Sequence, residues 1–388
     1  DADGFCDLAV GAYRQKDEER NLVGAVFVYL GSEAGLSSAP SIHLDNPAAP
    51  ADVGFGWCLD SVRDVNADGF ADLAVGAEFY DAGEGTEGAV LVYNGSHEGP
   101  PADPSDTILC PMRQPGSSFG IGISALDANL DGYADLGVGA YRFDAGSEDD
   151  GSFFVFFGSV SGLSGSDVGP LRIDNPERVP GGSFGFWSGS GDMNADFFPD
   201  IAVSATRQGT EGDGEVFLFE GGLSGVDTVA FVRYDMADPV PDNSGLFGEG
   251  LAVCDLDSDG YNDLVVGMPG YRPDPSADNS MGAVFLYYGG TTGPSGTPVA
   301  LTPPFPPPGG NEQFGFSVAC AGDLNGDGAA DLAVGDPLFG EGDELWSVGS
   351  VYIYYGSAAG IQAVPSFILE NVTSSNGEGS MGWSIASM

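Results

Sequence analysis

Carboxylate side chains recur in this sequence at the spacing that a tight loop needs to bind a hard cation. In the clearest copy, Asp255, Asp257, Asp259 and Asp263 occupy positions 1, 3, 5 and 9, and Gly260 occupies position 6. Oxygen ligands at positions 1, 3 and 5 converge on one point, the carbonyl group of position 7 adds another oxygen, and position 9 closes the far side. Glycine at position 6 permits a positive φ. One copy alone would also fit a polar turn that binds nothing, so its recurrence decides the interpretation.

The acidic loop recurs roughly every 65 residues, which is typical of a repeat architecture. Further complete copies start at Asp64, Asp127 and Asp323, and the chain itself opens inside another copy that lacks position 1. A weaker copy starts at Asp192, where Phe197 replaces the glycine of position 6. We therefore expect calcium in the four complete loops and an incomplete site at the start of the chain. We expect the Asp192 loop to be empty or distorted.

The expected calcium ligands are the side chains at positions 1, 3, 5 and 9 of each loop, together with the backbone carbonyl group of position 7. In chain order, these residues are Asp1, Asp3, Phe5, Asp7, Asp64, Asn66, Asp68, Phe70, Asp72, Asp127, Asn129, Asp131, Tyr133, Asp135, Asp255, Asp257, Asp259, Tyr261, Asp263, Asp323, Asn325, Asp327, Ala329 and Asp331. Without an ion, the carboxylates of one loop would repel one another, so we expect several calcium ions to hold the fold together.

Short glycine motifs flank the acidic loop in each repeat. An aromatic–Gly or Met–Gly pair precedes the loop, a Gly-Ala segment or a variant of it follows, and an aromatic β segment comes next. The pairs are Phe55-Gly56, Phe119-Gly120, Phe184-Gly185, Phe247-Gly248, Phe314-Gly315 and Met381-Gly382. This set resembles the FG-GAP repeat of the integrin α-subunit β-propeller and of its bacterial relatives, and the resemblance extends over essentially the whole chain. It implies that each repeat is a four-stranded blade, with calcium held in the hairpin between the first two strands.

The expected fold is all-β, with one β-propeller domain over residues 1–388 that contains six repeats of four-stranded blades. Period-2 alternation in segments rich in β-branched and aromatic residues, such as Ala89–Tyr93, favours strands throughout. The last segment, Met381–Met388, aligns with a first strand that stops just before its acidic loop. We therefore expect this strand to complete the N-terminal blade, which would close the ring and remove two exposed sheet edges. A seven-bladed propeller with one repeat missing from this chain is the alternative.

The composition is strongly acidic, and this excludes several classes of partner. The net charge is −47, from 58 acidic and 11 basic residues. Because so few basic residues are available to neutralise phosphates, we exclude nucleic acid as a partner. No segment approaches the ~20 apolar residues of a membrane span, so we expect no direct membrane insertion. Such acidity is expected of a secreted protein in a calcium-rich or salty medium, which indicates an extracellular or cell-surface location. Because the chain starts inside a motif, we take it to be a piece of a longer protein.

The five cysteines fit no zinc-binding pattern. They are Cys6, Cys58, Cys110, Cys254 and Cys320. Cys254 and Cys320 lie at the ends of expected first strands, where a small buried residue is required. We expect free buried thiols, with one disulfide as the alternative.

The sequence offers little support for catalysis. His43 and His97 are the only histidines, and both fall in expected outer-strand or loop positions. No Ser-His-Asp or Cys-His set is found, and calcium binding accounts for most of the paired carboxylates. The leading hypothesis is therefore a non-enzymatic, calcium-binding propeller that binds a protein or a glycan, as the family resemblance implies for adhesion. The alternative is the propeller domain of a secreted enzyme such as a polysaccharide lyase, which the scarcity of lysine and histidine disfavours.

Arginine is rare in this chain, yet four arginines stand at matching places after successive acidic loops. They are Arg14, Arg142, Arg207 and Arg272, and we expect them on the face opposite the calcium hairpins. Because a guanidinium group binds carboxylates through forked hydrogen bonds, the functional interpretation is a recognition surface for an acidic protein or glycan group. The alternative is that each arginine neutralises Asp and Glu residues of its own surroundings.

Overall fold

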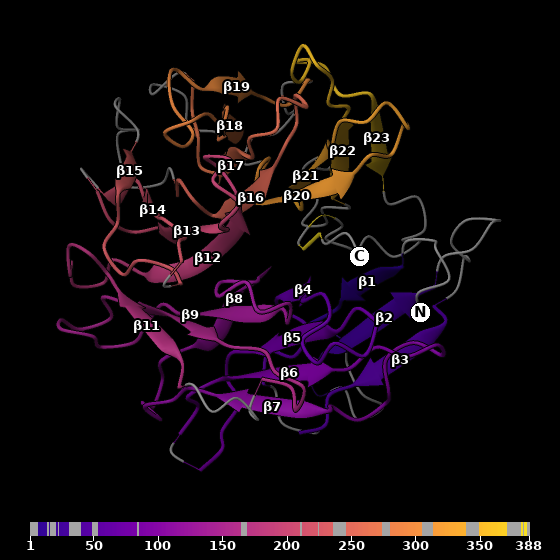
Figure 1. The fold of residues 1–388 in the computed structure, drawn as a ribbon, viewed down its shortest axis with the longest axis vertical. Coiled ribbons are helices and arrows are strands. Elements are labelled where there is room, and N and C mark those ends of the chain that lie inside the picture. The colour runs from indigo at the N-terminus through magenta and orange to yellow at the C-terminus, as the bar shows by residue number, and fades with distance from the viewer. Residues whose placement is uncertain are drawn as a thin grey trace. The chain divides into compact units, whose positions relative to one another are not determined.

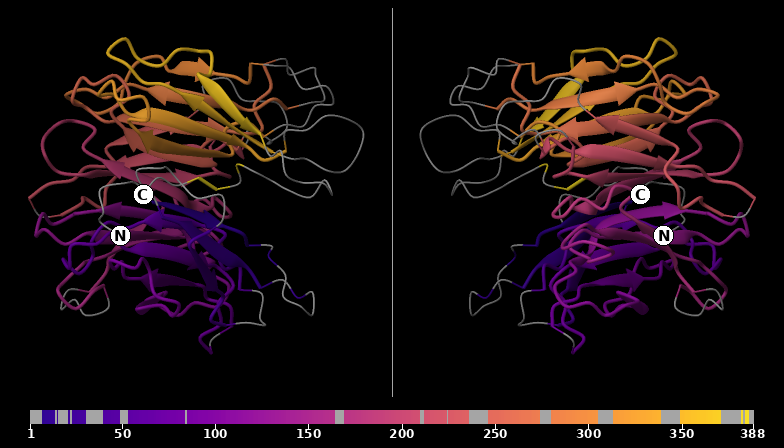
Figure 2. Two further views of the ribbon diagram at one scale, coloured as in Figure 1. Left: turned by 90° about the vertical axis from the view of Figure 1, so that its right-hand side faces the viewer. Right: turned by 90° about the vertical axis from the view of Figure 1, so that its left-hand side faces the viewer.

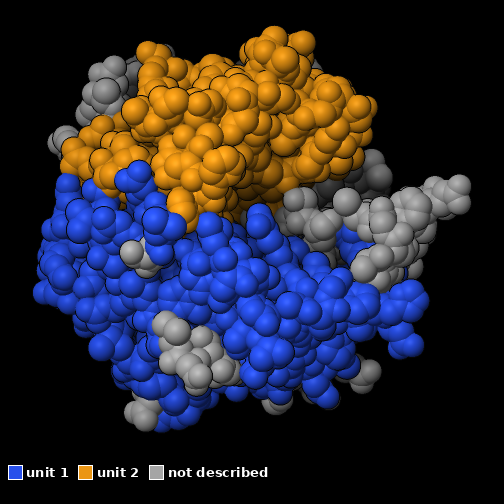
Figure 3. All heavy atoms as spheres, in the orientation of Figure 1, with its two compact units in different colours: residues 1–188, 219–230, 386–388 blue, residues 189–218, 231–385 orange. Residues whose placement is uncertain are grey.

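The computed structural model consists of β-strands and connecting loops. The residues that it describes are 7–13, 15, 21, 23–30, 40–48, 53–83, 85–163, 169–209, 212–223, 225–235, 246–273, 280–304, 313–338, 349–370, 382 and 384–385. The chain divides into two compact units, one comprising residues 1–188, 219–230 and 386–388 and the other comprising residues 189–218 and 231–385 (Figure 3). No helix in the described part of the chain is long and apolar enough to cross a membrane.

The first unit contains the first three sheets, drawn from indigo to magenta in Figure 1. The first sheet has the strand order β1-β2-β3, with the bounds β1 (Leu8–Gly11), β2 (Ala25–Tyr29) and β3 (Ile42–Asp45). The second has the order β4-β5-β6-β7, with the bounds β4 (Leu59–Ser61), β5 (Leu73–Ala77), β6 (Ala89–Tyr93) and β7 (Asp106–Leu109). The third has the order β8-β9-β10-β11, with the bounds β8 (Phe119–Leu126), β9 (Asp135–Ala140), β10 (Ser152–Phe156) and β11 (Leu171–Asp174).

Most of the fourth sheet and all of the fifth and sixth belong to the second unit, and Figure 2 shows their strands from two sides. The fourth sheet contains, in order, β12 (Phe184–Gly191), β13 (Asp200–Ala205), β14 (Glu215–Phe219) and β15 (Val232–Asp235). The fifth contains β16 (Gly250–Cys254), β17 (Asp263–Met268), β18 (Ala283–Tyr287) and β19 (Val299–Leu301). The sixth contains β20 (Ser317–Gly322), β21 (Asp331–Asp336), β22 (Ser350–Tyr354) and β23 (Phe367–Glu370).

Each sheet is an antiparallel meander, and burial within it follows the sequence pattern. Every residue of the second strands β9, β13, β17 and β21 is buried, because these continuous apolar runs are covered on both faces. In the outermost strands β3, β7, β11 and β15, only the third residue is buried. Four-stranded meanders of this kind are the blades of a β-propeller, so the all-β propeller fold that we expected is confirmed. The third strands begin and end within one residue of their expected bounds.

Glycine contacts explain why a Phe-Gly pair and a Gly-Ala segment occur in the same repeat. In the first unit, a Cβ atom on Gly139 of β9 would lie 1.8 Å from the carbonyl oxygen of Gly185, in the Phe-Gly pair of the next blade. In the second unit, a Cβ atom on Gly267 of β17 would lie 1.9 Å from the carbonyl oxygen of Gly315. Consecutive blades of one unit therefore pack backbone against backbone, at a distance that excludes any side chain. The same contact joins Gly11 to Gly56, Gly76 to Gly120 and Gly335 to Gly382.

Apolar cores lie between consecutive blades of one unit. In the first unit, Val90 of β6 belongs to the same buried cluster as Val138 of β9 and Phe154 of β10. In the second unit, Val265 of β17 clusters with Val334 of β21. Each repeat thus has an apolar face that only its neighbour covers, as in other repeat proteins whose units are not stable alone.

The cysteines depart from expectation. Cys254 and Cys320 form a disulfide, with their Cα atoms 6.1 Å apart, so the expectation of free thiols is wrong for this pair. Cys58 and Cys110 are free and buried. Sequence spacing did not reveal the disulfide because its partners come from two different repeats, 66 residues apart.

The expected closure of the ring by the C-terminal strand stays a prediction. The first sheet has three strands in the described part of the chain, and most of the segment that we expect as its fourth strand lies outside the described residues. The single domain over residues 1–388 and the alternative of seven blades are predictions for the same reason.

Replacing Gly139 or Gly267 with alanine should destabilise the fold, because a methyl group at either site would overlap a backbone oxygen of the next blade. We expect each variant to lose about 1–3 kcal/mol or more of its free energy of unfolding, as overpacked cores do. Urea denaturation measures this loss. Gly169→Ala is the control, because a Cβ atom there meets nothing within 4 Å. A wild-type unfolding midpoint for Gly139→Ala would contradict the close backbone contact.

Candidate metal sites and the arginine surface

The acidic loops share one set of hydrogen bonds between their side chains and their own backbone. In the first complete loop, the amide of Asp68 donates to Asp64 Oδ1 at 3.0 Å, and the amide of Gly69 donates to Asp64 Oδ2 at 2.7 Å. The amide of Phe70 donates to Asp68 Oδ1 at 3.0 Å. The same bonds recur in the loops that start at Asp127, Asp192, Asp255 and Asp323. The carboxylates at positions 1 and 5 are therefore held in the same place in these five described loops.

The loop that starts at Asp192 keeps this geometry although its glycine is missing. Phe197 adopts a φ of 77°, close to the 90° to 96° of the glycines at position 6 of the four other described loops. The side chain of Phe197 is 85% exposed, so the phenyl ring meets no steric obstacle in this conformation. The distortion that we expected from Phe197 is therefore not found, although a left-handed φ is costly for a residue with a Cβ atom. Whether an ion binds in this loop stays a prediction.

A buried aspartate at position 9 ties each loop to the rest of its blade. Asp263 is fully buried, and its Oδ2 atom accepts the amide of Leu256 at 2.9 Å. Its Oδ1 atom accepts the amide of Gly289, which lies 26 residues farther along the chain, at 2.8 Å. Asp72, Asp135 and Asp331 are equally buried and make the corresponding two bonds. The sequence predicted this aspartate as a ligand but did not reveal its architectural role, because the second donor is distant in sequence.

Burial disfavours the charged form of these aspartates, which a nearby positive charge would stabilise. Loss of solvent raises the pKa of Asp72 to about 6 and that of Asp135 and Asp263 to about 7. Backbone hydrogen bonds oppose this change, whereas the other carboxylates of the same loop add to it. In the loop that starts at Asp255, carboxylate oxygens of Asp255, Asp257 and Asp263 lie within 4.8 Å of one another. This donor set, made only of oxygen and with Asp263 buried at its inner end, fits a hard divalent cation.

The four complete loops share these hydrogen bonds, whereas part of the first predicted site lies outside the described residues. Asp1, Asp3 and Phe5 lie outside the described residues, whereas Asp7 is described and partly buried. The predicted ligands of the complete loops all lie in described segments. Their role as ligands stays a prediction.

Arg142 is the best candidate of the four arginines for recognition of a ligand. Its side chain is exposed, and its guanidinium carbon lies 5.2 Å from the ring centre of Tyr141. Tyr141 in turn packs edge to face against Phe186, with ring centres 5.1 Å apart. Within the described residues, Arg142 forms no ion pair, so its charge is not consumed by a local acid.

The other three arginines are less suited to binding a ligand. Arg14 lies outside the described residues, and Arg272 is partly buried and has contacts of its own. Arg207 is exposed, but its charge lowers the pKa of Glu249, whose Oε2 atom is buried and has no hydrogen-bond partner within the described chain. We interpret Arg207 as electrostatic support for Glu249.

Several arginines elsewhere in the described chain are paired with acids, as the alternative interpretation requires. Arg113 contacts the buried Glu87 at 2.9 Å. Arg172 and Arg178 both contact Asp174, at 2.8 Å and 3.0 Å. Local neutralisation therefore accounts for these arginines, and this contrast sets Arg142 apart.

Replacing Glu249 with glutamine should make the protein more stable above pH 7. Burial raises the pKa of Glu249 from 4.5 to about 7, so the folded state binds more protons than the unfolded state between these values. Stability should therefore fall as pH rises through this window, and Glu249→Gln should remove that fall. We expect a gain on the order of 1–3 kcal/mol at pH 8 and a smaller one at pH 4.5.

Urea denaturation at the two pH values, with calcium present throughout, measures this difference. Glu98→Gln, at an exposed site, is the control and should leave the pH dependence unchanged. Equal gains for Glu249→Gln at both pH values would contradict the raised pKa.

Comparison with known proteins agrees with this geometry. The FG-GAP-like repeat family matches residues 255–334, and the FG-GAP repeat family matches residues 55–93. Integrin alpha-7 of Rattus norvegicus is 40% identical over 190 residues, which cover 48% of this chain and 15% of that protein. Integrin alpha-6 of Gallus gallus is 40% identical over 141 residues, which cover 36% of this chain and 12% of that protein. The match thus spans less than a sixth of the length of these relatives.

Among solved structures, BBS1N in complex with ARL6DN covers 93% of this chain and 81% of its own, with 13% identity and a TM-score of 0.43. This likeness is too weak to add to the sequence matches. The repeated acidic loops, the glycine contacts between blades and the matches to both repeat families lead to one conclusion: the chain is a β-propeller that contains FG-GAP repeats and is similar in part to integrin α-subunits.

Proposed function

We propose that this chain is a calcium-stabilised extracellular binding domain, a single propeller over residues 1–388 that recognises a protein or glycan ligand in adhesion. The observation that carries the proposal is the acidic loop, whose geometry is the same in every complete repeat. Similarity to integrin α-subunits supports a role in ligand binding.

Calcium is the cofactor that this donor set favours. The ligands are the side chains at positions 1, 3, 5 and 9 and the carbonyl group of position 7, which provide oxygen only. A bound divalent ion would offset the repulsion among the carboxylates of one loop and the cost of burying position 9. The Cys254–Cys320 disulfide supports an oxidising compartment, where calcium is also abundant.

A catalytic role gains no support from the histidines. His43 stacks on Phe27, with ring centres 4.7 Å apart, and lies 3.6 Å from Asp45 on the outer strand β3. His97 is exposed in a loop. Neither histidine therefore has the buried partner that orients a general base. We propose that the domain binds its ligand without chemical change, and the lyase alternative stays open to test on acidic polysaccharides.

The ligand surface that we propose is centred on Arg142 and Tyr141. An unpaired guanidinium group on an aromatic ring suits a carboxylate or an acidic sugar, because the ring adds contact area and the fork binds two oxygens. In a chain with a net charge of −47, such a site is one of the few places where an acidic group would be attracted.

Calcium should stabilise the protein strongly, and two aspartate variants should separate the role of ligand from the role of architecture. At a hundredfold excess over the dissociation constant, mass action gives about 2.7 kcal/mol for each site. Asp257→Asn should reduce this gain without lowering the melting temperature in excess chelator, because it relieves repulsion in the ion-free loop. Asp263→Asn should lower the melting temperature in chelator too, because its amide group would face a backbone N–H donor.

Differential scanning calorimetry with calcium or with chelator measures these effects. The Asp103→Asn variant, at an exposed site outside the loops, is the control for loss of one aspartate. An identical wild-type melting temperature in calcium and in chelator would refute the calcium sites.

Replacing Arg142 with alanine should weaken binding to an acidic ligand by at least about tenfold, the usual effect of losing a charged hydrogen bond. The measurement is binding to immobilised acidic polysaccharides, with their uncharged counterparts in parallel. Arg233→Ala is the matched control, because Arg233 is engaged with Glu215 at 3.4 Å and Asp235 at 3.3 Å. If both variants bind a polysaccharide as tightly as the wild type does, Arg142 is not part of the site.

A further inference from the structure

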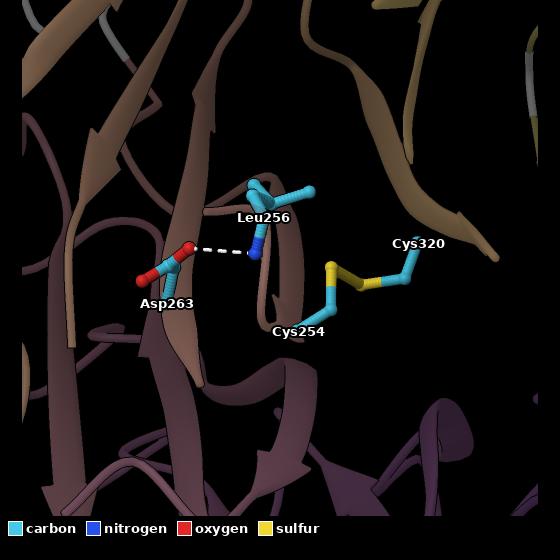
Figure 4. Close-up of a disulfide and its surroundings, with 4 residues drawn as sticks. All are labelled: Cys254, Leu256, Asp263 and Cys320. Carbon is cyan, nitrogen blue, oxygen red and sulfur yellow. Dashed lines mark hydrogen bonds between the residues drawn. A yellow bond between two sulfur atoms is a disulfide. The ribbon is translucent and has the colours of Figure 1, made fainter. Parts of the chain in front are cut away.

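The Cys254–Cys320 disulfide joins the bases of two consecutive acidic loops. Cys254 is the last residue of β16, directly before Asp255, and it lies opposite Asp263 in the pairing of β16 with β17. Cys320 lies in β20, three residues before Asp323, where the pairing with β21 shifts register. Figure 4 shows the disulfide beside the Leu256–Asp263 hydrogen bond that closes the first of these loops.

Hydrogen bonds also connect the two loops. The amide of Ala330 donates to the carbonyl oxygen of Asp255 at 3.2 Å, and the amide of Ser357 donates to that of Leu256 at 3.1 Å. The hydroxyl group of Ser258 donates to the carbonyl oxygen of Gly328 at 3.2 Å. The geometry of one loop is therefore not independent of the geometry of the next.

The first unit contains a matched pair of loops that lacks the disulfide. The amide of Ala134 donates to the carbonyl oxygen of Asp64 at 3.1 Å, and the amide of Ser159 donates to that of Val65 at 3.2 Å. The two backbone connections are thus the same as in the fifth and sixth blades. By strand register, the residues that correspond to the two cysteines are Val62 and Ala125. The amide of Val62 donates to the carbonyl oxygen of Asp72 at position 9, and Ala125 pairs with Leu136 as Cys320 pairs with Leu332.

A crosslink at this place acts on the metal-free loops. Without an ion, the clustered carboxylates of each loop repel one another, and this repulsion favours movement of the loop away from its ion-binding geometry. The disulfide limits this movement, because it holds the end of β16 against β20. Less ordering is then required when an ion binds, and preorganisation of this kind raises affinity without adding a ligand.

We propose that the Cys254–Cys320 disulfide is a positioning crosslink that preorganises the Asp255 and Asp323 loops for a divalent cation. This inference is based on the proposed function, in which these loops bind calcium. It predicts that loops of identical donor type differ in their affinity for the ion. The two crosslinked loops should bind it more tightly than uncrosslinked loops with the same ligands.

Terbium luminescence can test the two pairs separately, because terbium is a hard, oxygen-seeking cation and a nearby tyrosine sensitises its emission. Tyr261 stands at position 7 of a crosslinked loop, and Tyr133 stands at position 7 of an uncrosslinked loop. Titrations of terbium into Tyr133→Phe and Tyr261→Phe proteins therefore report each loop in turn. In the Cys254→Ser/Cys320→Ser background, we expect the affinity reported by Tyr261 to fall about tenfold and that reported by Tyr133 to stay unchanged.

Equal affinity with and without the disulfide would overturn the inference, and so would equal losses at both loops, which would indicate general loosening of the fold. If the double serine variant does not fold, Val62→Cys/Ala125→Cys provides the converse test. Once oxidised, it should tighten terbium binding at the loop reported by Tyr133, and an unchanged affinity would count against the proposal. Absence of any terbium or calcium binding by the wild-type protein would instead refute the proposed function.

Discussion

The hydrogen bonds of a buried aspartate at position 9 of each acidic loop organise the blade around it. One carboxylate oxygen receives an N–H group from the start of the loop, and the other receives one from beyond the third strand, as Asp263 does with Leu256 and Gly289. Three segments that are distant in sequence are thereby held at one point. The carboxylate is removed from water, and its pKa is raised because two neutral donors offset the loss of hydration only in part. The residue that fixes the blade is therefore also the residue that most favours a cation.

The contacts between blades follow from a second constraint, which is the absence of side chains where backbones meet. Gly139 and Gly267 tolerate no Cβ atom, and their partners come from the Phe-Gly pair of the next blade. The cost of this device is the conformational freedom of glycine in the unfolded chain. Its benefit is that the apolar residues beside it, such as Val138 and Val334, reach the neighbouring blade and complete a core. Blade packing and loop spacing are thus set by the same short motif.

Most of the fold could be predicted because its signals are local and repeated. Ala89–Tyr93, for example, is a strand with the bounds that its alternation predicts. Features that depend on contacts between repeats could not be predicted in this way. The Cys254–Cys320 disulfide is one example, since neither cysteine has a local signal that marks a partner. Phe197 is another, because the sequence shows the steric penalty at position 6 but not the loop hydrogen bonds and the open solvent that allow the residue to adopt a φ of 77°.

The repeats also differ in how their loops are reinforced, and the differences fall at equivalent positions. Opposite position 9, one repeat has Val62 and another has Cys254, although the backbone hydrogen bonds that connect each loop to the next are the same. The shared bonds belong to the repeat and are required for any blade to pack. The residues that vary are free to differ because the backbone geometry does not depend on them. Variation at such positions is therefore where one propeller can acquire loops of unequal affinity while every blade keeps the same fold.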